Sequence, residues 1–92
     1  MARVDPDRLV RDLARRVAEL RRERGWSQAD LAEALACSVQ RVAVIEGGSA
    51  NLTLHTLARL ATIFGLPVAD LFKTPKNESK KVGPGRPRVR RD

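Results

Sequence analysis

A stretch of the chain just before its middle carries side chains of the types that read base edges in DNA. Residues 38–46 have the sequence SVQRVAVIE. A glutamine amide can bond N7 and N6 of adenine, a valine can touch a thymine methyl, and an arginine can reach guanine or a phosphate. Placed on one short helix, these groups would suit the major groove. The residues expected to be exposed on that helix are Val39, Gln40, Arg41, Ala43 and Val44.

Such a helix needs a second helix to hold it, and the preceding residues predict one. Ser27 is a good N-cap, and Asp30 stands three residues later, as in a capping box. Ala36 and Cys37 leave a very short connection before Ser38, which is predicted to cap the helix Val39 to Glu46. Two short helices joined by a tight turn form the helix-turn-helix arrangement, in which the second helix enters the major groove. Packing between the two helices is assigned to Leu31, Ala32, Leu35, Val42 and Ile45.

Helical periodicity continues on both sides, so an all-α domain of five helices is predicted. Asp5-Pro6 predicts the start of the first helix and Gly25 its end. Its apolar stripe is Leu9, Leu13, Val17 and Leu20. Thr53 and Gly65 are expected to bound a fourth helix, and a short fifth helix is expected from Pro67 to Phe72. The residues predicted to be buried on the fourth helix are Leu54, Leu57, Leu60, Ala61 and Phe64.

Charge divides the 92-residue chain into a domain, 1–72, and a basic tail, 73–92. The domain holds ten Lys and Arg against nine Asp and Glu, a net charge of +1, whereas the tail holds eight against two, a net charge of +6. The tail has many prolines and glycines and no periodicity, so it is expected to be disordered when free and to add little to packing from Pro75 onward. Its charge favours a polyanion as partner; a tail that only aids solubility is the alternative.

Residues from about 14 to 72 resemble the Cro/repressor (Xre) family of helix-turn-helix proteins. The matching stretches are Leu20-Arg21 through Gly25-Trp26-Ser27-Gln28, Asp30-Leu31-Ala32, Val42 to Gly48, and Leu57 to Phe72. The resemblance implies a helical domain that binds operator DNA as a homodimer, with Gln28 against a phosphate and Val39, Gln40 and Val44 facing bases. Ser38, Arg41, Ala43, Asn51 and Thr53 complete the predicted DNA-contacting set of the domain.

Two positions depart from the pattern of the family. Ala36 stands where a glycine is usual in the turn, so an alanine with positive φ would be strained by roughly 1–2 kcal/mol. Leu52 stands where proline is frequent. Neither departure argues against the fold.

The tail contains a motif of its own, Pro84-Gly85-Arg86-Pro87-Arg88, which resembles the core of an AT-hook. An extended Gly-Arg-Pro segment can lay its arginines along a narrow A·T-rich minor groove. Arg86 and Arg88 are therefore candidate DNA contacts, although Pro84 stands where a basic residue is usual.

Other chemistry finds little support in the sequence. Arg21 and Glu46 are expected to pair, tying the first helix to the end of the third. The single cysteine, Cys37, excludes an internal disulfide, fits a reducing cytoplasm and is expected to pack in the core. His55 is a lone histidine. We expect no enzymatic activity, metal site or cofactor. We also expect no membrane segment and no signal peptide.

The expected function is that of a sequence-specific DNA-binding transcriptional regulator of the cytoplasm, associated with the nucleoid. The dimer interface is expected at Leu66, Val68 and Phe72, with residues 6–13 as a second possibility. One alternative is an architectural, nucleoid-type DNA binder. Another is an interaction module such as an antitoxin or a coactivator.

Overall fold

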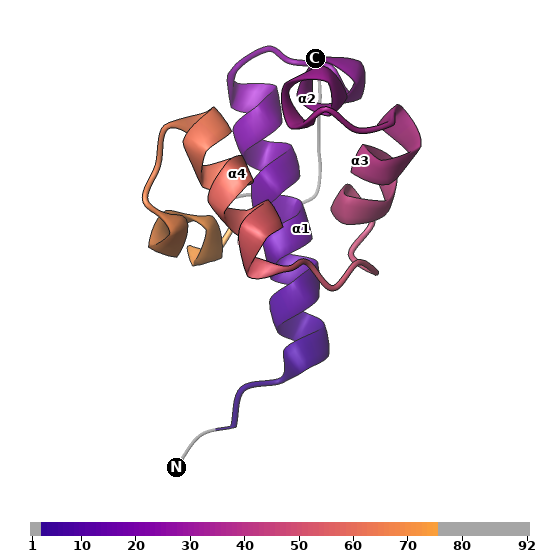
Figure 1. The fold of residues 1–92 in the computed structure, drawn as a ribbon. Helices are drawn as coiled ribbons and strands as arrows, with labels where there is room; N and C mark the ends of the chain where they lie inside the picture. Colours follow the sequence, from indigo (N-terminus) through magenta and orange to yellow (C-terminus); the bar gives the residue numbers. More distant parts are fainter. Residues whose placement is uncertain (1–2, 76–92) are drawn as a thin grey trace, which may run out of the picture.

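All regular structure in residues 3–75, the part described by a computed structural model, is helical (Figure 1). The tail from residue 76 onward, with Arg86 and Arg88, lies outside the described residues. The elements are α1 (Pro6–Glu23), α2 (Gln28–Leu35), α3 (Val39–Glu46), α4 (Leu54–Phe64) and the 3₁₀ helix η1 (Val68–Phe72). The expected all-helical class is thus confirmed.

The helices begin where their caps predicted. Ser27 Oγ accepts a hydrogen bond from the Asp30 amide at 3.0 Å, and an Asp30 carboxylate oxygen accepts one from the Ser27 amide at 2.8 Å, which completes a capping box. Ser38 and Thr53 cap α3 and α4 in the same way, each accepting from the amide three residues on. These bonds satisfy amides that would otherwise lack partners at a helix start.

In the turn between α2 and α3, Ala36 has the positive φ at which an alanine is strained. Its φ and ψ are 57° and 47°, the left-handed region. The Cys37 amide bonds the Ala32 carbonyl at 2.9 Å and the Ala36 amide bonds that of Glu33 at 3.1 Å, as in a Schellman motif. Backbone hydrogen bonds therefore close the turn, although alanine does not favour the left-handed conformation that Ala36 adopts.

α1 runs through the middle of the molecule, with α2 and α3 on one side and α4 and η1 on the other (Figure 1). Its first turns extend beyond the other helices (Figure 1). This extension corrects the predicted stripe, because Leu9 is 43% exposed and burial begins at Leu13. The core common to the helices comprises Leu13, Val17, Leu20, Leu31, Ala32, Leu35, Val42, Ile45, Leu57, Leu60, Ala61, Phe64 and Leu71.

Leu54 is not part of this core. It was expected on the buried side of α4 but is 81% exposed. Leu54 is the first residue of α4, and within residues 3–75 that end of the helix stays exposed, whereas Leu57 and Leu60 further along are buried. The periodicity was right, and the expected extent of the covered face was wrong.

The fifth helix also differs from the prediction. Among residues 3–75, four α-helices are followed by a 3₁₀ helix of five residues, for which Pro67 is the N-cap rather than the first helical residue. The Asp70 amide bonds the Pro67 carbonyl at 2.9 Å, the i to i+3 pattern typical of such short elements. Leu71 anchors η1 in the core, whereas Val68 and Phe72 remain exposed.

Two buried features were not predicted. Arg16 and Glu19, neighbours on α1, form an ion pair at 2.9 Å and are only 8% and 5% exposed. Arg16 Nε also donates to the Asp70 carbonyl at 3.0 Å, which fastens η1 to α1. Pro75 is fully buried, so the expectation that the chain adds little to packing from this residue onward is wrong at Pro75 itself.

Candidate nucleic-acid interface

The two faces of α3 differ in the way that a recognition helix requires. Val42 and Ile45 are 0% and 3% exposed and hold the helix on the core. The residues predicted to face outward are all exposed, namely Val39, Gln40, Arg41, Ala43 and Val44. An outward surface that combines branched apolar groups with an amide and a guanidinium can bond base edges and contact thymine methyls.

The width of an α-helix fits a DNA groove. A helix with its side chains is about 10–12 Å across, and the major groove is about 12 Å wide. The 8 residues of α3 make about two turns. With α3 in the groove, the loop after its end would leave the groove beside a phosphate backbone.

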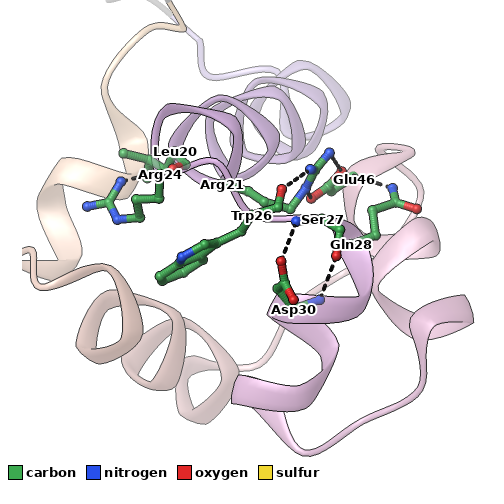
Figure 2. Close-up of polar contacts among 8 residues, drawn as sticks. All are labelled: Leu20, Arg21, Arg24, Trp26, Ser27, Gln28, Asp30 and Glu46. Carbon is green, nitrogen blue, oxygen red and sulfur yellow. Dashed lines mark hydrogen bonds and ion pairs between the residues drawn. The ribbon is translucent and has the colours of Figure 1, made fainter.

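Glu46, the last residue of α3, fixes the orientation of this helix (Figure 2). Its carboxylate accepts from Arg21 Nε at 2.7 Å and Arg21 Nη2 at 3.1 Å, so the pair expected from the sequence is confirmed. Arg21 Nη1 also donates to the Trp26 carbonyl at 2.7 Å. The end of α3 is thereby tied to α1 and to the segment that enters α2.

Gln28, predicted to face a phosphate, has a partner within the fold. Its amide nitrogen donates to Glu46 Oε1 at 3.0 Å, beside the Arg21 contact (Figure 2). This bond links the first residue of α2 to the last residue of α3, and sequence reasoning missed it. One amide N–H and the amide oxygen are left for other partners.

The remaining predicted residues lie at the ends of helices. Ser38 Oγ accepts from the Arg41 amide at 3.0 Å, and Thr53 Oγ1 accepts from the Thr56 amide at 3.1 Å. The Ser38 hydroxyl can still donate a proton, whereas the Thr53 hydroxyl donates to Thr56 Oγ1 at 3.1 Å. Asn51 is exposed in the loop between α3 and α4. Cys37 is half-buried against the core, as its packing role predicted.

A pair of aromatic rings completes the support of α2. Trp26, which precedes the Ser27 cap, stacks on Phe64 with ring centroids 5.8 Å apart. The Arg24 guanidinium lies 4.9 Å from the Phe64 centroid and donates to the carbonyls of Leu20 and Phe64. These contacts join the end of α1 and the segment after it to the end of α4. Figure 2 shows Arg24 and Trp26 apart from the cluster around Glu46.

Within residues 3–75 no group of three or more His, Cys, Asp or Glu side chains is placed to hold a metal ion. None of the helices in this range combines the length and apolar content needed to cross a bilayer.

Comparison with known proteins places the fold. The family model described as "Helix-turn-helix domain" matches residues 12–72. The chain is 41% identical over 61 residues to the HTH-type transcriptional regulator DdrOP3 of Deinococcus deserti, covering 66% of this chain and 47% of that protein. It is 32% identical over 76 residues to the HTH-type transcriptional regulator SutR of Escherichia coli, covering 83% of this chain and 43% of that protein. The chain thus spans less than half the length of these relatives.

Solved structures agree with these matches. The restriction-modification controller protein C.AhdI from Aeromonas hydrophila has 30% identity and a TM-score of 0.65, covering 68% of this chain and 96% of its own. The hypothetical transcription factor NHTF from Neisseria has 25% identity and a TM-score of 0.69, and the match covers 87% of this chain and 93% of that chain. With the capped α2–α3 unit, these matches show that the chain belongs to the helix-turn-helix domain family, of the Cro/Xre type.

Proposed function

We propose that the chain is a sequence-specific DNA-binding regulator of transcription, acting in the cytoplasm at the nucleoid, which reads the major groove with α3. The observation that carries this proposal is the contrast between the two faces of α3. Val39 and Val44 are 46% and 44% exposed, although Val42 and Ile45 on the same short helix are buried. Branched apolar side chains held outward on a short, firmly anchored helix suit contact with thymine methyls.

Gln40 has the central role in this proposal. An exposed amide near the start of α3 can accept from N6 and donate to N7 of adenine. Arg41 reaches guanine or a phosphate. Gln28, Ser38, Asn51 and Thr53 bond phosphates, which fixes the register of the helix on the duplex without reading sequence.

We infer that two copies bind together. Val68 and Phe72 are 40% and 42% exposed on η1, beside the half-buried Leu66, and together offer an apolar surface. In a symmetric dimer joined there, the two α3 helices would enter successive major grooves about 34 Å apart. Residues 1–72 form the binding domain in this proposal. The tail adds phosphate contacts and, through Arg86 and Arg88, contacts in the minor groove.

Selection of bound sequences from a random duplex pool, followed by footprinting, tests the proposal. Enrichment of one inverted repeat, protected as a discrete site, is the expected result. Uniform coverage of A·T-rich DNA without a preferred sequence would instead make the chain an architectural binder. Absence of DNA binding together with a stoichiometric protein partner would make it an interaction module.

A further inference from the structure

The loop that follows α3 lacks positive charge of its own. Between Arg41 and Arg59 the sequence contains no lysine or arginine. If α3 lies in the major groove, residues 47–53 leave the groove directly after the helix and come close to a phosphate backbone. Phosphate oxygens at such an edge are usually met by cations as well as by neutral donors. A cation for this loop must therefore come from another element.

A hollow of about 390 Å³ lies between this loop and the first turns of α1. It is open to the surface and has α1 residues on one side and loop residues on the other. The lining residues are Pro6, Asp7, Val10, Arg11, Gly47, Gly48, Ser49 and Asn51. The only lysine or arginine among them is Arg11.

Arg11 lies beside the loop at Gly48. Gly48 has a φ of +85°, and a Cβ built there would lie 3.4 Å from Arg11 Cγ and 3.6 Å from Arg11 Cα, an ordinary van der Waals contact. The positive φ therefore favours glycine at this position. The stem of Arg11 lies next to the backbone of the loop, and Arg11, Ser49 and Asn51 line the same hollow.

Within residues 3–75, no ion pair or hydrogen bond occupies the Arg11 guanidinium. Other arginines of α1 are engaged: Arg8 pairs with Asp12, Arg16 with Glu19 and Arg21 with Glu46. Arg11 is exposed, and no such ion pair or hydrogen bond uses its head group. A guanidinium in this setting can bond a phosphate with two parallel N–H donors.

We propose that Arg11 binds a backbone phosphate at the edge of the groove read by α3, with Ser49 and Asn51 as neutral donors across the hollow. This inference rests on the proposed function, since it places α3 in the groove. Arg11 stands one residue before the helix-turn-helix match begins, so the contact belongs to the α1 extension. Asp7 lines the same hollow. Its negative carboxylate would repel the phosphate.

Salt-dependent binding by the full chain tests the proposal. The probes are the duplex enriched from the random pool and a scrambled duplex of the same composition. Arg11→Met should weaken binding to both about tenfold, and should lower the slope of log affinity against log salt by about 0.9. Arg8→Met is the matched control, because it removes the same side chain one turn away and outside the hollow. It should change the slope less than Arg11→Met does.

A positive charge introduced on the loop side of the hollow should restore the DNA binding lost in Arg11→Met. The double variant Arg11→Met/Ser49→Lys should recover the lost slope on both duplexes, and Asp7→Asn should tighten binding. An unchanged slope in Arg11→Met, or an equal loss in Arg8→Met, would overturn the phosphate contact. Gln40→Ala in the same titrations separates the two proposals. If it relaxes specificity while Arg11→Met has no effect, only the Arg11 contact fails; if no sequence preference exists in the parent chain, the proposed function itself fails.

Discussion

Arg21 and Glu46 join α1 to the last residue of α3 through an ion pair of 2.7 Å, with side chains only 12% and 7% exposed. Glu46 also accepts from Gln28, at the start of α2. One carboxylate therefore sets the positions of three helices. Both this contact and the apolar core hold the outward face of α3 in place.

Replacing Arg21 by alanine should destabilise the fold and weaken DNA binding. Glu46 would be left nearly buried without its cation, which costs about 3–5 kcal/mol of unfolding free energy. Urea denaturation measures the loss. Arg8→Ala is the control, because its pair with Asp12 is 3.6 Å long and the Arg8 side chain is 66% exposed, so the change should stay below about 1 kcal/mol. An unchanged denaturation midpoint in Arg21→Ala would contradict this role of the pair.

Ala36→Gly should stabilise the protein. Ala36 has a φ of 57°, where a Cβ costs about 1–2 kcal/mol. The greater freedom of glycine in the unfolded chain offsets about 0.4–1 kcal/mol of that gain, so a net rise of roughly 0.5–1 kcal/mol is expected in thermal or urea unfolding. The reciprocal change Gly65→Ala, at a φ of 71° with no atom near the added Cβ, should cost a similar amount. A loss of stability in Ala36→Gly would show that this turn is not strained.

Phe72→Glu should yield a monomer. Phe72 is 42% exposed, so a carboxylate there leaves the core intact but opposes an apolar dimer interface. Sedimentation should show the parent chain as a dimer on its site and the variant at half that stoichiometry, with weaker binding. Leu9→Glu, on the α1 extension, is the comparison variant. If it dissociates the dimer and Phe72→Glu does not, the interface lies at residues 6–13 instead.

Substitutions in the tail should separate a minor-groove contact from simple charge. Arg86→Ala and Lys80→Ala each remove one cation. If the AT-hook-like segment enters the minor groove, Arg86→Ala should lose more affinity than Lys80→Ala, and more on A·T-rich flanks than on G·C-rich flanks. Equal losses on both flanks would rule out the hook and leave electrostatic attraction, whose salt slope falls by about 0.9 per contact.

Helix boundaries could be predicted because local chemistry fixes them. Ser27, Ser38 and Thr53 each cap a helix through a bond to an amide three residues away. Such caps depend on neighbouring residues only, so the sequence contains the needed information. The exposed set on α3 followed from the same local argument, once the buried face of the helix was assigned.

What could not be predicted depends on where distant segments meet. Leu9 and Leu54 have the right periodicity but lie near helix ends, where they are 43% and 81% exposed among the described residues. Arg16 and Glu19 are buried because η1 packs against α1, and their only sequence signal is opposite charge three residues apart beside the apolar stripe. Arg11 meets Gly48 across 37 residues of sequence (48 − 11), and helical periodicity carries no information about that contact.

Binding by Gln40→Ala to single-base variants of the enriched site tests base reading by α3 most directly. Gln40 is exposed, so the variant should unfold at the same temperature as the parent chain. We expect a loss of about 1–3 kcal/mol on the preferred duplex, with discrimination relaxed at one base pair of each half-site. Equal weakening on every sequence would contradict the account, because Gln40 would then contact only the backbone.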